Sequence, residues 1–296
     1  EYNTIKKGTE ILLAENDGFN QNIELSVEFQ DRPEILINKR NNQIHIICRE
    51  ISHYYRALNY AIHHMEEDEF QYREHVCFER NGLMLDCSRN AVFTVEKVKF
   101  LIKTLAKLGM NVLMLYTEDT YEVEGQPYFG AYRGKYTKDE IKELDAYASM
   151  FGVELVPCIQ TLAHLHNVLK WPGMDKIRDS ADILQPEKEE TYQFIEKLLS
   201  SVKENFSTNR VHLGMDEAVM LGLGNYLKEN GYKKGSLIIR EHCNRVVDIC
   251  RKLELKPMIW SDMYITANST GGYYDLPENT DLSLIHISEP TRPEPI

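Results

Sequence analysis

From residue 82 onward, short apolar runs alternate with amphipathic segments, and this alternation is the feature that most restricts the fold. The apolar runs have the length of strands that are buried on both faces. They lie at residues 82–88, 111–116, 153–159, 210–214 and 257–260. The segments between them have helical spacing and occupy residues 94–109, 137–151, 187–205 and 237–253. Such strand–helix repeats predict an α/β fold with a parallel sheet and right-handed crossovers.

The number of repeats indicates which α/β architecture is present. Five units occupy about 180 residues, whereas a complete (β/α)8 barrel needs about 250. We therefore expect an incomplete (β/α)8 TIM barrel of about five strand–helix units. A doubly wound open sheet would show the same alternation, but no GxGxxG motif or P-loop follows the first strand. This absence disfavours the nucleotide-binding version.

The segment before the barrel has a different pattern. Alternating runs at 11–15, 23–29, 34–39 and 43–48 predict strands, with a turn at Asn41-Asn42. Residues 51–65 have the spacing of a helix, and the charged stretch after Met65 is the expected boundary. These features predict a small α+β domain over residues 1–78, followed by the partial catalytic barrel over 79–281.

Composition excludes several classes of function. The net charge of −12 and the lack of a dense Lys/Arg stripe argue against nucleic acid as a partner. No run of about 18 apolar residues is present, so no membrane span is expected. None of the six cysteines forms a CxxC pair or has zinc-finger spacing, so we expect reduced thiols and a cytoplasmic location. We expect no metal and no cofactor.

Polar and aromatic residues follow each predicted barrel strand. The carboxyl ends of barrel strands converge on one pocket, so these residues are expected to lie together although they are dispersed in sequence. Carboxylates can transfer protons, aromatic rings can stack on the faces of sugars, and His and Arg can form hydrogen bonds with sugar hydroxyls. The residues, in strand order, are Asp86, Ser88 and Arg89; Tyr116, Glu118 and Asp119; Gln160, His164 and His166; Asp216 and Glu217; Trp260, Asp262 and Tyr264.

The sharpest local signal is the stretch from His212 to Glu217, which reads HLGMDE. It resembles the H-x-G-x-D-E signature of glycoside hydrolase family 20. The surrounding VHLGMDEAVMLGLGNYL, with GLMLDCSRN and PCIQTLAH on earlier strands, is similar to the branch of exo-β-N-acetylglucosaminidases of streptococci and related Firmicutes. The likeness extends from Phe78 to Tyr264, and more loosely through the small domain.

The resemblance implies an enzyme that removes terminal β-linked N-acetylglucosamine or N-acetylgalactosamine from oligosaccharides or glycoconjugates. Two adjacent carboxylates cannot easily flank both faces of one glycosidic bond, which disfavours a covalent enzyme intermediate. In the family the substrate's own acetamido oxygen attacks the anomeric carbon. Glu217 would then be the general acid and base, and Asp216 would orient the acetamido group. An ordinary surface Asp-Glu pair at a helix start is the alternative.

Other residues are expected in the substrate pocket by the same resemblance. His164 would contact the substrate, or alternatively form structural hydrogen bonds. Trp260 would form part of the wall of the acetamido pocket, or alternatively belong to the core. The nearest candidate for the family's sugar-binding arginine is Arg80, whereas Asp86 and Arg89 are expected to form a structural ion pair. The remaining candidates are Glu118, Asp119, Asp262 and Tyr264.

Three alternatives compete with this hypothesis. A chitinase-like barrel would carry a DxxDxDxE signature on the fourth strand, which is absent. A sugar-binding or catalytically inactive barrel is the main alternative, and the intact Glu217 argues against it. A zinc enzyme is disfavoured because His164 and His166 have no paired ligand nearby in the sequence.

The last residues differ from the rest of the chain. Leu282 to Arg292 reads LSLIHISEPTR, which resembles a translated frame of a sequencing-library transposase adapter. We therefore expect residues 282–296 to be non-native and the natural sequence to be cut short near Asp281. The family's later strands supply further pocket residues, so the 296-residue chain is expected to be a nearly inactive fragment.

Overall fold

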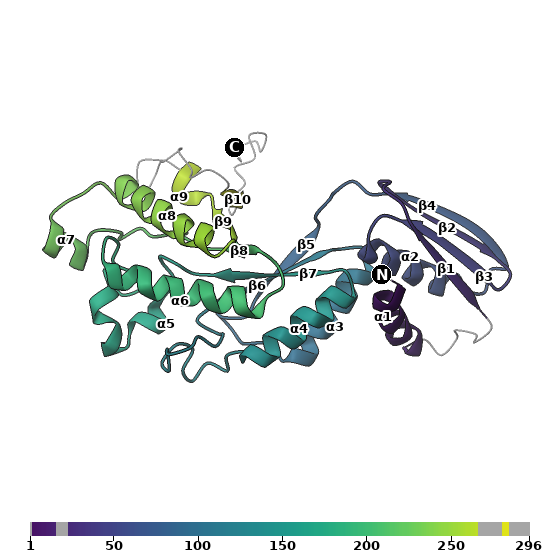
Figure 1. Ribbon diagram of the computed structural model, residues 1–296, viewed down its shortest axis with the longest axis horizontal. Helices are drawn as coiled ribbons and strands as arrows, with labels where there is room; N and C mark the ends of the chain where they lie inside the picture. Colours follow the sequence, from purple (N-terminus) through teal and green to yellow (C-terminus); the bar gives the residue numbers. More distant parts are fainter. Residues whose placement is uncertain (1, 16–22, 266–279, 284–296) are drawn as a thin grey trace, which may run out of the picture. The chain divides into compact units, whose positions relative to one another are not determined.

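The computed structural model describes residues 2–15, 23–265 and 280–283, and the chain divides into two compact units (Figure 1). Unit 1 comprises Glu1–Leu85, Phe93–Met114 and Asp139–Leu155. Unit 2 comprises Asp86–Val92, Leu115–Lys138 and Val156–Ile296. The division between these units therefore lies within the strand–helix region, and the domain boundary at residue 78 stays a prediction.

Unit 1 contains a four-stranded sheet in the order β1-β3-β2-β4. Its strands are β1 (Glu24–Phe29), β2 (Glu34–Arg40), β3 (Gln43–Cys48) and β4 (Glu69–His75). β1 runs parallel to β3, and β2 is antiparallel to both β3 and β4. The inward isoleucines of β2 and β3 are buried, and α2 (Ile51–His63) packs on these two strands. Asn41 adopts φ 49° between β2 and β3, at the predicted turn.

Two predictions for this region were wrong. A strand was expected over residues 11–15, but residues 11–14 belong to helix α1 (Tyr2–Ala14). Its buried residues Ile5, Gly8 and Leu12 recur at helical spacing, which a five-residue window does not reveal. Strand β4 was not predicted, and it begins at Glu69, inside the charged stretch that follows Met65. Four of its seven residues are exposed, and its apolar content is low.

The second sheet has the order β10-β9-β8-β7-β6-β5. Its strands are β5 (Gly82–Asp86), β6 (Val112–Glu118), β7 (Glu154–Ile159), β8 (Arg210–His212), β9 (Lys256–Trp260) and β10 (Asp281–Ser283). The pairs β7–β8, β8–β9 and β9–β10 are parallel. An α/β architecture with a parallel sheet is thus confirmed.

The connecting helices are α3 (Val95–Lys107), α4 (Lys138–Met150), α6 (Glu189–Asn205) and α8 (Gly235–Lys252). The Oγ1 of Thr94 accepts the backbone N–H of Lys97 at 3.3 Å, which caps α3 as predicted. Short elements follow the carboxyl ends of three strands. They are α5 (His166–Leu169) and η1 (Pro172–Ile177) after β7, α7 (Asn225–Asn230) after β8, and α9 (Asp262–Ile265) after β9.

Strand β8 is shorter than the predicted 210–214 because the backbone leaves the extended region after Leu213. Gly214 and Met215 have φ values of 73° and 70°. At the other end of the sheet, β10 includes Leu282 and Ser283, and residues 284–296 lie outside the described residues.

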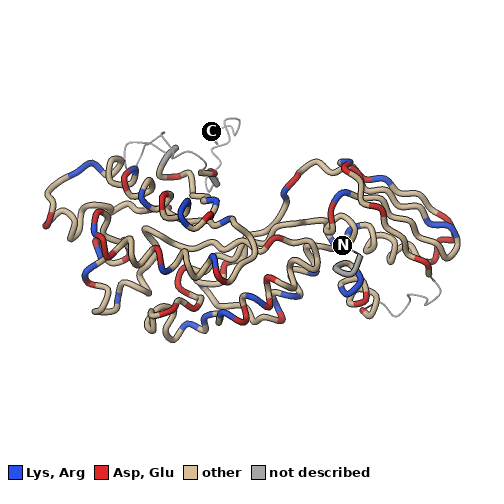
Figure 2. Tube along the Cα trace, viewed as in Figure 1, with Lys and Arg blue, Asp and Glu red and all other residues tan. Residues whose placement is uncertain are grey.

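None of the six cysteines forms a disulfide bond; Cys77 is exposed and the other five are buried. Basic and acidic residues are interspersed along the described helices and strands (Figure 2). Within the described ranges, no helix has both the length and the apolar character needed to cross a bilayer.

Candidate active site

The turn after β8 places two neighbouring carboxylates in different environments. Asp216 is 2 % exposed, whereas the side chain of Glu217 is 55 % exposed. The backbone achieves this with left-handed conformations at Gly214, Met215 and Glu217, at φ 73°, 70° and 51°. Each non-glycine residue held there costs about 1–3 kcal/mol, and such strain concentrates at functional sites.

Gly214 is required by the packing of this turn as well as by its backbone angle. A Cβ at this position would lie 2.0 Å from Oε1 of Gln160 and 2.9 Å from the carbonyl oxygen of Ile159. The turn therefore packs directly against the end of β7. This close approach brings the Gln160 side chain to the Asp216 carboxylate.

Asp216 is held as a buried carboxylate by two side chains that follow β7. Its Oδ1 accepts a hydrogen bond from Nε2 of Gln160 at 3.0 Å, and its Oδ2 lies 3.1 Å from Nε2 of His164. Burial opposes ionisation, but the His164 imidazole and the Gln160 amide outweigh it and hold the pKa of Asp216 below its ordinary value. Conversely, the Asp216 carboxylate raises the pKa of His164. The pair is therefore an aspartate and a readily protonated histidine.

Glu217 is connected to the same histidine and to the end of β9. Its Oε2 lies 3.6 Å from Nε2 of His164. Its backbone N–H donates to Oδ2 of Asp262 at 2.9 Å, which fixes the turn against the first residue of α9. Burial raises the pKa of Asp262. His164 thus lies within ion-pair distance of both carboxylates of the adjacent pair.

Beneath the turn, His212 and Trp260 pack against each other with ring centroids 4.3 Å apart. Nδ1 of His212 accepts the backbone N–H of Gly214 at 3.1 Å, and the backbone N–H of Trp260 donates to the carbonyl of Gly214 at 3.1 Å. Complete burial lowers the pKa of His212 to about 3. The signature histidine is therefore a neutral ring that supports the turn.

A second group of polar side chains follows β5 and β6 and reaches the carboxylate pair through Gln160. Nε2 of Gln160 donates to the hydroxyl of Tyr116 at 3.2 Å, and that hydroxyl donates to Oε1 of Glu118 at 3.0 Å. Oγ of Ser88 donates to Oε2 of Glu118 at 2.6 Å. Arg89 donates to the Tyr116 hydroxyl at 3.0 Å. The network joins residues from the ends of β5, β6, β7 and β8.

Asp119 completes this group together with an arginine from the loop after β6. Nε of Arg133 lies 3.3 Å from Oδ1 of Asp119, and Nη2 of Arg133 donates to the carbonyl and the hydroxyl of Ser88 at 2.6 Å each. Burial raises the pKa of Asp119, partly offset by Arg133. The sequence pattern did not indicate Arg133, because it lies in mid-loop rather than at a strand end.

Most predicted site residues meet here, but Arg80 does not. It precedes the amino end of β5 and forms an ion pair with Glu154, the first residue of β7. Since β7 and β8 are parallel, that end of the sheet is opposite the end that bears Asp216. The expectation for Arg80 is therefore corrected, and Arg89 instead lies at the carboxyl end of β5. Arg89 also lies 3.7 Å from Asp86, as expected for an ion pair.

The structure does not assign two further predicted residues to this polar network. His166 is exposed at the start of α5. Tyr264 belongs to α9, but its side chain lies outside the described residues, so its role stays a prediction. Across the residues that the structure describes, no cluster of three or more His, Cys, Asp or Glu could hold a metal ion.

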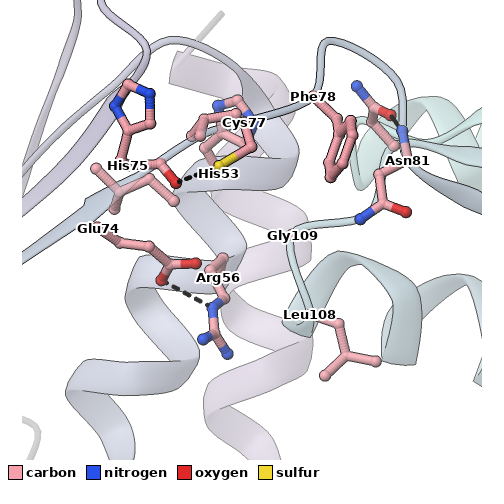
Figure 3. A pocket seen from close by; sticks show the side chains of 12 residues that line it. His53, Arg56, Glu74, His75, Cys77, Phe78, Asn81, Leu108 and Gly109 are labelled. Atoms are coloured by element: carbon pink, nitrogen blue, oxygen red, sulfur yellow. Dashed lines mark hydrogen bonds and ion pairs between the residues drawn. The ribbon is translucent and has the colours of Figure 1, made fainter.

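A separate cavity of about 220 Å³ lies within unit 1 (Figure 3). Its lining includes His53, Cys77, Phe78 and an ion pair in which Nε of Arg56 lies 3.2 Å from Oε2 of Glu74. None of the predicted site residues lines it. The candidate active site is therefore the polar network around Asp216 and Glu217 in unit 2.

Comparison with known proteins indicates the family of the chain. The model of glycosyl hydrolase family 20, catalytic domain, matches residues 78–283. Hexosaminidase D of Bos taurus is 29 % identical over 166 residues, which cover 53 % of the chain and 48 % of the relative. A beta-hexosaminidase of Akkermansia muciniphila is 30 % identical over 167 residues, which cover 46 % of the chain and 34 % of the relative. The chain thus spans half or less of these relatives' length.

Solved structures show the same fold. A family 20 exo-β-N-acetylglucosaminidase of Vibrio harveyi, in complex with N-acetylglucosamine, has a TM-score of 0.76 at 18 % identity. The match covers 95 % of the chain and 52 % of that structure. A mutant β-hexosaminidase of Streptomyces plicatus, in complex with its product, has a TM-score of 0.73 at 16 % identity and covers 97 % and 63 % respectively. At this identity the likeness establishes the fold of a TIM-barrel catalytic domain.

Proposed function

The chain belongs to glycosyl hydrolase family 20, and on this basis we propose that the full-length protein removes terminal β-linked N-acetylhexosamine from glycans. One observation carries the proposal: a buried Asp216, held by Gln160 and His164, directly precedes an accessible Glu217. The reaction we propose is hydrolysis with retention, assisted by the substrate's 2-acetamido group.

The adjacency of the carboxylates supports this mechanism over a covalent one. A protein nucleophile and a separate acid must lie on opposite faces of the sugar, about 5 Å apart, and usually come from different strands. Asp216 and Glu217 come from the same turn. We therefore assign the nucleophile to the acetamido oxygen of the substrate and give the two carboxylates different tasks.

Asp216 orients the acetamido group. Its lowered pKa keeps it ionised, and each carboxylate oxygen has a lone pair left after binding Gln160 or His164. An ionised carboxylate accepts the acetamido N–H and turns the carbonyl oxygen toward the anomeric carbon. It also stabilises the positive charge that develops as the oxazolinium ring closes.

Glu217 moves the proton. In the first step it donates a proton to the glycosidic oxygen while the acetamido oxygen bonds to the anomeric carbon and the C–O bond breaks. In the second step it removes a proton from water, whose oxygen attacks the same carbon and reopens the ring. The side chain of Glu217 is 55 % exposed, so it can reach both a leaving group and water.

The surrounding residues would bind the terminal sugar. We propose that Trp260 forms one wall of the acetamido pocket. Arg89 and Glu118 offer a cation and an anion to the sugar hydroxyls, and they are positioned by Tyr116. Asp119 supports this group through Arg133. Tyr264 and Asp262 remain predicted contributors from the end of β9.

Further proposals concern the chain as given. We propose that it belongs to the branch found in streptococci and related Firmicutes, and that its reduced thiols suit a cytoplasmic location. We also propose that residues 1–296 alone hydrolyse substrate slowly, because they form an incomplete barrel. Equal turnover by this chain and by the full-length protein would overturn that expectation.

Hydrolysis of 4-nitrophenyl N-acetyl-β-glucosaminide by the full-length protein tests the proposed function. We expect release of 4-nitrophenol that falls by several orders of magnitude in Glu217→Gln, with folding confirmed by circular dichroism. The competing hypothesis is a sugar-binding or catalytically inactive barrel. Binding of N-acetylglucosamine without hydrolysis by the unmodified protein would favour that alternative and reject our proposal.

A further inference from the structure

Three aromatic side chains gather on the loops that follow β6 and β7. The ring of Trp171 lies 5.0 Å from that of Tyr128 and 6.5 Å from that of Tyr132, measured between centroids. Tyr128 is 55 % exposed and Tyr132 is 98 % exposed. Large aromatic rings that project into solvent together commonly mark a binding surface.

The loop that carries the tyrosines is built to hold them in place. Gly130, Tyr132 and Gly134 all have left-handed backbone conformations, and for Tyr132 this costs about 1–3 kcal/mol. Phe129 is fully buried and packs on Tyr121 with ring centroids 5.0 Å apart. These contacts thus hold the strained backbone of Tyr132 in a conformation in which its side chain is exposed to solvent.

The same loop is tied to the catalytic network. Arg133, the neighbour of Tyr132, pairs with Asp119 and donates to Ser88, which in turn donates to Glu118. A Cβ on Gly130 would lie 2.3 Å from the carbonyl oxygen of Asp119, so the loop packs directly on the end of β6. The loop that carries the two tyrosines is therefore in direct contact with residues of the carboxylate network.

We propose that Tyr128, Tyr132 and Trp171 form a platform that binds the sugar on the leaving-group side of the scissile bond. This inference rests on the proposed function. An enzyme that removes a terminal sugar encloses that sugar, so the remainder of the glycan must leave across the loops around the pocket. A pyranose ring offers an apolar C–H face, which suits an aromatic surface.

Polar groups beside Trp171 fit the hydroxyls of the same sugar. Nζ of Lys170 lies 5.5 Å from the centroid of the Trp171 ring and donates to Oδ1 of Asn167 at 3.3 Å. An aromatic surface with a few polar groups at its edge is the usual composition of a site for a neutral, hydroxyl-rich ligand. The platform therefore selects glycan substrates over glycosides with a small leaving group.

The test compares two substrates of the full-length protein: the disaccharide N,N′-diacetylchitobiose and methyl N-acetyl-β-glucosaminide, whose leaving group is only methanol. We expect Trp171→Ala to lower the ratio of kcat/KM for diacetylchitobiose to that for the methyl glycoside about three- to tenfold. Tyr132→Asn should lower it in the same direction, and asparagine tolerates the left-handed backbone. Because Tyr132 is 98 % exposed, this variant keeps the test valid if Trp171→Ala does not fold.

Phe100→Ala is the matched control, since Phe100 is 57 % exposed but lies in the middle of α3. Its ratio should equal that of the unmodified protein. An unchanged ratio in both platform variants would overturn the platform while leaving the hydrolase intact. Failure of the unmodified protein to hydrolyse either substrate would instead reject the proposed function. A change of oligomeric state with no change in the ratio would reassign the patch to protein association and overturn the proposal.

Discussion

Replacing His164 with Asn should lower the free energy of unfolding. It should also move the acid limb of the pH–activity profile toward neutral pH, so that the enzyme is active over a narrower pH range. His164 has φ 55°, and asparagine tolerates that conformation, so the change removes the imidazole with little backbone strain. The Asp216 carboxylate would then keep Gln160 but lose the ion-pair partner that lowers its pKa. Because burial opposes ionisation of Asp216, its pKa should rise.

The size of the effect follows from the geometry. At 3.1 Å and an effective dielectric constant of about 20, two unit charges attract each other by about 5 kcal/mol. Solvent reaches the His164 side chain, which is 21 % exposed, and part of the attraction offsets desolvation. We therefore expect the variant to lose about 2–4 kcal/mol of unfolding free energy where both partners are charged.

The pH dependence has a definite sign. The pKa of Asp216 is lowered by folding, so its contribution is present above the ordinary value of 3.8 and is lost as pH falls through the folded value. The pKa of His164 is raised, so its contribution is present below 6.5 and is lost as pH rises through the folded value. The difference between the two proteins should be largest between pH 3.8 and 6.5.

Urea unfolding across pH measures this difference, and kcat/KM across pH measures the effect on catalysis. The acid limb of the variant's profile should move toward neutral pH, with a loss of about tenfold or more near pH 5. His166→Asn is the control, because His166 is exposed and lies two positions away. A stability difference that does not vary with pH, or an acid limb that does not move, would refute the proposed pairing of His164 with Asp216.

Three further predictions concern single residues. Glu217→Gln should lower kcat by at least about 10²–10⁴-fold while leaving substrate binding measurable, and a change of less than tenfold would remove Glu217 from proton transfer. Gly214→Ala should lower the urea midpoint by the equivalent of about 2–4 kcal/mol, because its Cβ meets Gln160 at 2.0 Å; an unchanged midpoint would show that the turn can relax. Arg89→Lys should raise KM for the aryl glycoside, whereas Arg80→Ala should leave KM unchanged; the reverse pattern would restore the original assignment of Arg80.

The sequence predicted the second sheet better than the first. Strands β5 to β9 and the four long helices were found within a few residues, because strands buried on both faces read as continuous apolar runs between segments of helical spacing, whereas β10 was not predicted. Helix α1 was missed because its buried positions Ile5, Gly8 and Leu12 are spread over about two turns. Strand β4 was missed because its alternating exposed residues are charged or polar and resemble a linker.

The sequence predicted which side chains lie together at the turn after β8, but it predicted less well which arginines lie near them. Asp216, Glu217 and His164 were identified because they follow buried strands, and the structure brings them together. Arg80 was proposed from the resemblance alone, although a residue that precedes β5 lies at the amino end of the parallel sheet. Arg133 was missed because its role depends on how a long loop folds back onto Ser88, which no local pattern encodes.

Acetamido participation, the central claim, can be measured with a series of aryl β-glucosaminides that carry N-acetyl, N-fluoroacetyl, N-difluoroacetyl and N-trifluoroacetyl groups. Each fluorine withdraws electrons from the carbonyl oxygen and makes it a poorer nucleophile without changing the leaving group. If that oxygen attacks the anomeric carbon while Asp216 holds the N–H, kcat/KM should fall steeply along the series, by orders of magnitude in total. A rate that stays flat across the series would contradict the account and point to a nucleophile supplied by the protein.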